Sequence, residues 1–110
     1  MNEELREQLL AFREDRNWGQ FHNPKDLAIS LSLEASELLE NFQWKTSEET
    51  VAAKGQELAD ELADVLIYAF FLAEALDLNM EEIIRNKMKK NAAKYPVDKS
   101  FGTMTKYTEL

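Results

Sequence analysis

Residues that break helices are scarce in this chain: among its 110 residues are only three glycines and two prolines. Glycine and proline disfavour the interior of a helix more than any other residue. Apolar residues also recur at helical spacing, as Leu5, Leu9 and Phe12 do near the start. We therefore expect an all-α protein with a four-helix-bundle-like fold.

Capping residues and breakers set the expected boundaries of these helices. We place them at residues 3–16, 24–42, about 53–76 and 80–94. Asn23 and Asn79 are suited to cap the second and fourth helices, and proline is well tolerated at a first helical position such as Pro24. The polar connection 44–53 reads as a loop, although Thr46 and Glu49 could form a capping box that begins the third helix earlier. Residues 97–110 read as an irregular tail.

Length and composition limit the class of protein. A chain of this length fits a single domain, residues 1–110. It contains no cysteine, which excludes disulfides and thiolate zinc sites. No signal segment opens the chain, and the longest apolar run, residues 65–73, is far shorter than the roughly 20 residues that span a bilayer. We expect a soluble, cytoplasmic protein without a membrane partner.

The charge of the chain is unevenly distributed. The net charge is −8, which argues against nucleic acid as a partner. Residues 1–84 carry a balance of −13, whereas residues 85–110 carry +5. Solubility explains such a distribution; the alternative is an acidic metal site accompanied by a basic segment for phosphates.

Two pairs of carboxylates stand out, Glu34 with Glu37 and Glu61 with Asp64. Each pair is spaced three residues apart, so each lies on one face of its helix. Helices often carry such pairs in solvent. Here, however, the strip that holds Glu34 and Glu37 is flanked by apolar residues on both sides, which is unusual for a solvated face.

The third helix gives the stronger indication. Asp64 is the single charge between residues 62 and 73, and the apolar residues of this segment surround the helix, which predicts burial. A buried carboxylate without a partner costs roughly 3 kcal/mol or more. No Lys or Arg occurs between Lys54 and Arg85 to pair with it. A bound cation is the simplest compensation.

The second and third helices should form an antiparallel hairpin that brings the two pairs together. Position 34 faces 64, and 37 faces 61, because the members of each couple are equally far from residue 49. Four oxygen-bearing side chains suit Mg²⁺, with Mn²⁺ as the alternative. A di-iron site would need Glu-x-x-His pairs, and the one histidine, His22, lies outside both helices.

Two further groups of residues complement such a site. Lys87, Lys90, Asn91 and Lys94 form one basic face of the fourth helix, suited to phosphates or simply solvated. Trp18, Phe21, His22 and Trp44 lie in or beside loops, where flat rings can stack on a nucleobase or fill a core. Tyr68 shares the helix face of Glu61 and Asp64.

At the level of motifs, the chain resembles the MazG-like all-α nucleoside triphosphate pyrophosphatases, and within them the dCTP pyrophosphatase branch. The pairs Glu34-Ala-Ser-Glu37 and Glu61-Leu-Ala-Asp64 look like the metal-binding signature of that family. The more specific stretches are residues 17–24 (NWGQFHNP), 42–44 (FQW), 61–68 (ELADVLIY), 87–91 (KMKKN), 94–96 (KYP) and 106–110 (KYTEL).

The resemblance implies a Mg²⁺-dependent enzyme that hydrolyses nucleoside triphosphates such as dCTP between the α- and β-phosphates and cleanses nucleotide pools. It implies a homotetramer. It implies that Glu34, Glu37, Glu61 and Asp64 hold the metal and that one of the glutamates orients the attacking water. Base and sugar contacts would come from Trp18, His22, Trp44 and Tyr68, and phosphate contacts from Lys87, Asn91, Lys94 and Tyr95. A non-catalytic helical interaction or regulatory module is the alternative reading.

Overall fold

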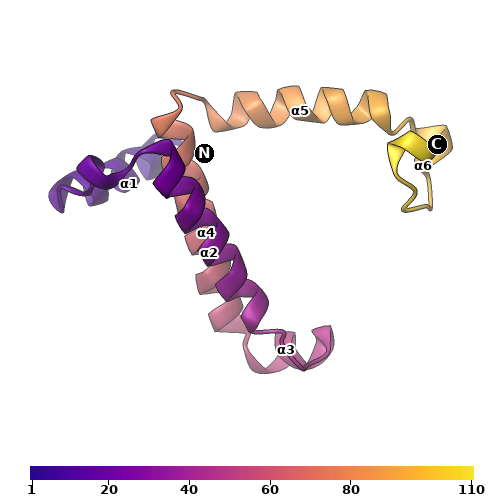
Figure 1. Ribbon diagram of the computed structural model, residues 1–110, viewed down its shortest axis with the longest axis horizontal. Helices are drawn as coiled ribbons and strands as arrows, with labels where there is room; N and C mark the ends of the chain where they lie inside the picture. Colours follow the sequence, from indigo (N-terminus) through magenta and orange to yellow (C-terminus); the bar gives the residue numbers. More distant parts are fainter. The chain divides into compact units, whose positions relative to one another are not determined.

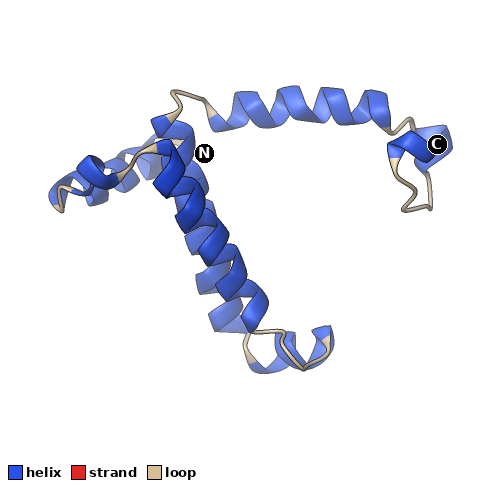
Figure 2. Cartoon of the chain, viewed as in Figure 1, coloured by secondary structure: helices blue, strands red, loops and turns tan.

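The computed structural model describes all 110 residues, which form helices and no strand (Figures 1 and 2). The all-α prediction is therefore confirmed. The α-helices are α1 (Glu3–Asp15), α2 (Pro24–Glu40), α3 (Ser47–Ala53), α4 (Gly55–Ala75), α5 (Met80–Lys94) and α6 (Val97–Ser100), and the 3-10 helices are η1 (Trp18–Phe21) and η2 (Tyr107–Glu109). The chain divides into two compact units, Met1–Asp77 and Leu78–Leu110.

The predicted starts of α2 and α5 are correct, and the expected caps form. The side chain of Asn23 accepts a hydrogen bond from the backbone N–H of Asp26 at 2.9 Å, with Pro24 in the first turn. The side chain of Asn79 accepts one from Glu82 N–H at 3.0 Å. Both bonds satisfy a backbone donor that a helix leaves unpaired at its start.

The connection between α2 and α4 differs from the prediction of a loop. The capping box forms: Thr46 Oγ1 accepts from Glu49 N–H at 3.1 Å, and the Glu49 carboxylate accepts from Thr46 N–H at 3.3 Å. It begins a separate helix, α3, instead of extending α4, because Lys54 adopts a non-helical conformation (φ −126°, ψ 32°) before Gly55.

The tail also has more structure than predicted. Residues 97–100 form the single turn of α6, and residues 107–109 form η2. Within this unit the Tyr107 ring lies against the ring of Tyr95, with centroids 5.9 Å apart, and 4.6 Å from Lys94 Nζ.

The first unit is organised around an antiparallel hairpin of α2 and α4, which lie side by side along their lengths, with α3 at the closed end (Figure 1). Its apolar core is small and lies toward the open end, with Leu27, Phe70, Phe71 and Ala73 buried. Arg6 ties α1 to the end of α4 through two hydrogen bonds to the Glu74 carboxylate, at 3.1 and 3.2 Å.

The prediction that residues 62–73 are buried on all sides is wrong for this chain. Leu62 is 49% exposed and Leu66 is 55% exposed. The physical reason is that α2 and α3 are the elements packed most closely along α4, so the side of α4 that carries these leucines has no cover. No helix of the structure combines the length and the apolar character needed to cross a membrane.

Candidate metal centre and adjoining pocket

Three of the four predicted carboxylates meet between α2 and α4. Glu34, Glu61 and Asp64 each present an oxygen within 4.8 Å of the others. Glu37 lies beside them, close enough to raise the pKa of both Glu34 and Glu61. The hairpin register inferred from the sequence therefore brings these side chains together.

The cluster has no cationic partner within the first compact unit. None of the ion pairs in the structure involves these four residues. One oxygen of Glu34 and one of Glu61 are buried without any hydrogen-bond partner. Buried polar atoms are nearly always paired in folded proteins, so two orphaned carboxylate oxygens in one cluster point to a ligand that pairs with them.

Burial and mutual repulsion change the ionisation of the cluster. The pKa of Glu34 is raised to about 7, first by burial and then by Glu37 and the other two carboxylates. The pKa of Glu61 is raised as well, again first by burial and then by Glu37. Ionising all of these carboxylates at once is therefore unfavourable, and a bound cation would remove this free-energy cost.

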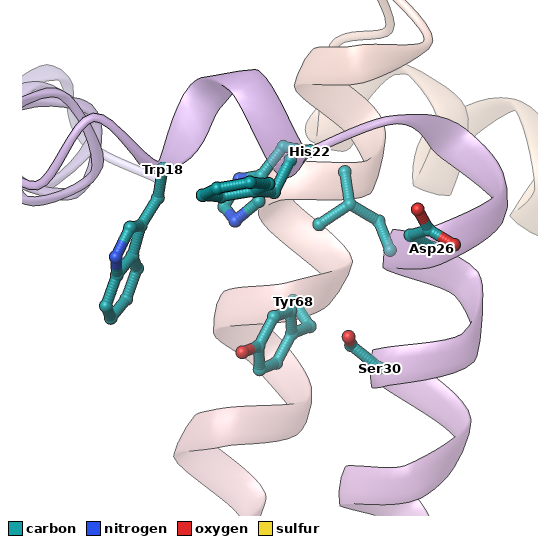
Figure 3. Close-up of a pocket in the computed structure, with 7 residues that line it drawn as sticks. Trp18, His22, Asp26, Ser30 and Tyr68 are labelled. Atoms are coloured by element: carbon teal, nitrogen blue, oxygen red, sulfur yellow. The ribbon is translucent and has the colours of Figure 1, made fainter.

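An aromatic pocket of about 360 Å³ opens next to the cluster (Figure 3). Trp18 belongs to η1, His22 follows η1, Tyr68 comes from α4, and Asp26 and Ser30 come from α2. Phe21 and Leu27 complete its lining. Trp18 is held by an edge-on contact with Phe12, with ring centroids 5.7 Å apart. The pocket thus combines flat rings with a few polar groups, as small-molecule sites usually do.

The rings of this pocket are electrostatically linked to their surroundings. Burial lowers the pKa of His22, as does the charge of Arg13, so the imidazole is neutral at pH 7. Burial raises the pKa of Tyr68, followed by the charges of Glu34, Asp64 and Glu37. The Tyr68 hydroxyl therefore stays protonated, and it lies close enough to the acidic cluster to be affected by its charges.

A second cavity, also about 360 Å³, lies on the other side of the cluster. It is polar, and Lys54 is its one cationic group. Its lining residues are Glu37, Glu40, Asn41, Lys54 and Glu61. Glu61, a member of the cluster, and Glu37 beside it thus also line this cavity.

The remaining predicted site residues are Trp44 in the first unit and four residues of the second unit. Trp44 is 92% exposed, has a positive φ of 64° and does not line the aromatic pocket. Lys87, Asn91 and Lys94 are on α5 and Tyr95 follows it, all in the second compact unit. Their phosphate-binding role stays a prediction.

The sequence reasoning missed several lining residues. Ser30 lines the aromatic pocket, and its place one turn before Glu34 on the same helix face was a usable signal in the sequence. Asp26 lies in the first turn of α2 and reads as an ordinary helix-start acid. Lys54 is the last cation before Asp64 in the sequence, and nothing in its spacing marks it as a site residue.

Comparison with known proteins matches most of this chain. It matches the MazG-like family over residues 29–110. It is 38% identical to rat (Rattus norvegicus) dCTP pyrophosphatase 1 and 36% identical to the human (Homo sapiens) protein, in each case over 98% of this chain and 66% of the relative. The chain thus spans slightly less than two thirds of these relatives.

A solved structure is similar as well. A pyrophosphatase from Archaeoglobus fulgidus DSM 4304 superposes with a TM-score of 0.81 at 45% identity, over 86% of this chain and 91% of the archaeal one. The family match begins within α2 and includes both carboxylate pairs. The resemblance noted in the sequence is confirmed, and this chain belongs to the MazG-like family.

Proposed function

We propose that this protein is a Mg²⁺-dependent nucleoside triphosphate pyrophosphohydrolase that converts dCTP or a related deoxynucleotide to the monophosphate and pyrophosphate. Support comes from relatives that are named dCTP pyrophosphatase 1 and from a similar archaeal structure named a pyrophosphatase. The observation that carries the proposal is the cluster of Glu34, Glu61 and Asp64, whose oxygens lie within 4.8 Å of one another without a cationic partner.

The residues of the cluster fit a hard divalent cation. All of them offer carboxylate oxygens, the ligand type that Mg²⁺ and Mn²⁺ prefer. The two orphaned oxygens, one on Glu34 and one on Glu61, are ready acceptors for such an ion. Glu34, Glu37, Glu61 and Asp64 would hold Mg²⁺, which when bound neutralises phosphate charge and activates water. One of the glutamates would orient the attacking water.

The aromatic pocket would hold the base and sugar. Trp18, neutral His22 and Tyr68 offer flat surfaces, and aromatic stacking on a base contributes roughly 1–3 kcal/mol in single-strand binders. Tyr68 follows Asp64 by four residues on α4, so a base in this pocket lies about one helical turn from the cluster. This spacing would place the α-phosphate near the metal.

The native molecule is proposed to be a homotetramer. Two pairs of exposed apolar residues each lie one helical turn apart. They are Ile29 with Leu33 on α2, and Leu62 with Leu66 on α4. Exposed apolar rows of this kind favour association. Because Trp44 projects from the closed end of the hairpin, its proposed base contact would be made in a neighbouring subunit. Lys87, Asn91, Lys94 and Tyr95 would bind phosphates in the assembled enzyme.

The test is a panel of common NTPs and dNTPs with pyrophosphate readout, in Mg²⁺ and in EDTA. We expect the highest rate with dCTP or a close relative and no turnover in EDTA. Hydrolysis in ¹⁸O-labelled water should label the monophosphate, because water attacks the α-phosphorus. Label only in pyrophosphate, or release of single phosphate with a diphosphate co-product, would refute the reaction.

Variants of the cluster provide the matched comparison. Asp64→Asn should lose nearly all turnover and the rise in melting temperature on adding Mg²⁺, since an amide is a poor substitute for an anionic ligand. Glu57→Gln is the control, because Glu57 is an exposed carboxylate in the first turn of the same helix. A fully active Asp64→Asn protein would show that this carboxylate does not serve the reaction.

A further inference from the structure

The polar cavity beyond the acidic cluster is lined by one cationic side chain, Lys54, which has no role in the proposed metal and base sites. Lys54 lines this cavity together with Glu37, Glu40, Asn41 and Glu61. It is half-buried, and its position is fixed by the fold, since its backbone N–H bonds to the carbonyl of the fully buried Thr50 at 2.8 Å. Lys54 therefore has a defined place at the edge of the cluster.

The hairpin arranges three features in a row. Tyr68 of the aromatic pocket comes four residues after Asp64 on α4, and Lys54 comes seven residues before Glu61. At 1.5 Å per residue these separations are about 6 and 10 Å along the helix axis, and Lys54 and Glu61 line the same cavity. The acidic cluster thus lies between a base-sized aromatic pocket and a lysine.

A second lysine reinforces this end of the hairpin. Lys45 precedes α3 in the sequence, and Lys54 follows it. The pKa of Lys45 is lowered because the Lys54 ammonium group lies close to it and repels its charge. Neither lysine takes part in any ion pair of the structure. Two neighbouring ammonium groups that are not engaged in an ion pair can attract a multiply charged anion, although Glu49 acts on Lys45 and three glutamates line the cavity beside Lys54.

We propose that this cavity binds the β- and γ-phosphates, with Lys54 as the direct contact and Lys45 as its support, so that the nucleotide runs from the aromatic pocket across the cluster toward α3. The inference rests on the proposed function and adds an orientation of the substrate and a subsite for pyrophosphate within the first compact unit. Asn41, on the same lining, supplies an additional neutral polar group.

A competing role for Lys54 is to neutralise the carboxylates around it. The two roles predict opposite results. If Lys54 only offsets negative charge, Lys54→Gln strengthens Mg²⁺ binding and leaves pyrophosphate affinity unchanged. If Lys54 binds phosphate, the same variant weakens pyrophosphate binding selectively.

The experiment is calorimetric titration of the full chain with inorganic pyrophosphate, and separately with dCMP, at saturating Mg²⁺. Lys54→Gln should raise the Kd of pyrophosphate about ten-fold, the effect expected for losing a charge-assisted hydrogen bond, and change the Kd of dCMP less than two-fold. Lys45→Gln should have a smaller effect in the same direction. Lys54→Arg, which restores the charge, should recover most of the affinity.

Lys89→Gln is the matched control, because it removes the same charge from an exposed position of α5 outside the proposed sites. Unchanged pyrophosphate affinity in Lys54→Gln, or an equal loss for dCMP, would overturn the inference. Because binding is measured without turnover, a wild-type protein that hydrolyses no nucleotide would refute the proposed function alone. Wild-type hydrolysis together with an unaffected Lys54→Gln titration would refute the subsite alone.

Discussion

At the scale of single residues, Glu34 is the group whose environment departs furthest from that of an ordinary glutamate. One of its oxygens is buried without a partner, and its pKa is raised from the usual 4.5 to about 7. The fold therefore holds this carboxyl in a place where ionisation is disfavoured. Such perturbed groups cluster at functional sites, which is consistent with its place in the candidate metal centre.

This shift predicts how stability depends on pH when no metal is present. Between about pH 4.5 and 7 the unfolded chain loses the Glu34 proton while the folded chain keeps it. The folded state then binds more protons, so the free energy of unfolding decreases as pH rises through this window and levels off above it. Glu61 acts in the same direction, since its pKa is also raised.

The measurement is thermal unfolding in EDTA at pH 4.5 and pH 8. Glu34→Gln should melt at a higher temperature than wild type at pH 8 and at about the same temperature at pH 4.5, where both side chains are neutral. Glu57→Gln, an exposed glutamate of α4, is the charge-matched control. A Glu34→Gln variant that is no more stable than wild type at pH 8 would contradict the claim that the ionised Glu34 carboxylate destabilises the folded state.

The carboxylates could be predicted from the sequence, but some residues of the neighbouring cavities could not. Asp64 was recognisable because no other charge occurs between residues 62 and 73, and the antiparallel register then selected its partners. Asp26 and Lys54 carry no such mark, because charged residues at helix starts and connections are common in solvent. Their place in cavities depends on the turn between helices, which spacing within a helix does not reveal.

At the scale of elements, the sequence indicates where α3 begins but not where it ends. The capping box of Thr46 and Glu49 was recognisable in the sequence, and it forms. Whether the helix then continues into α4 depends on the conformation of Lys54, which breaks it. The buried Thr50 anchors this turn, with its hydroxyl donating to the carbonyl of Thr46 at 2.9 Å.

The capping box makes a testable contribution to stability. Thr46→Ala removes the oxygen that accepts from Glu49 N–H but keeps the carbonyl that accepts from Thr50. We expect a loss of about 1 kcal/mol in the free energy of unfolding by urea, the usual cost of removing such a cap. Thr108→Ala, at an exposed position in η2, is the control and should change little. Equal unfolding midpoints for Thr46→Ala and wild type would show that the box is not stabilising.

At the scale of the whole molecule, many large apolar side chains remain exposed to solvent. Few hydrophobic side chains are buried: Leu27, Phe70, Phe71 and Ala73. The sequence predicted burial around α4 because its pattern is apolar on all sides. A periodic pattern does not indicate whether the cover is part of the same chain or of a second copy, and here the outer side of α4 remains open.

This surface predicts that the protein assembles through the hairpin. Leu66 lies on the opposite face of α4 from Asp64, so changing it does not touch the candidate metal centre directly. Placing a charge in an apolar interface costs several kcal/mol without a partner. Leu66→Glu should therefore convert the proposed tetramer into smaller species in light scattering coupled to gel filtration. Val51→Glu is the control, because Val51 is comparably exposed, at 58%, but lies on α3 away from these rows. A Leu66→Glu protein with the same mass as wild type, or a wild-type protein that is monomeric at micromolar concentration, would contradict assembly through this face.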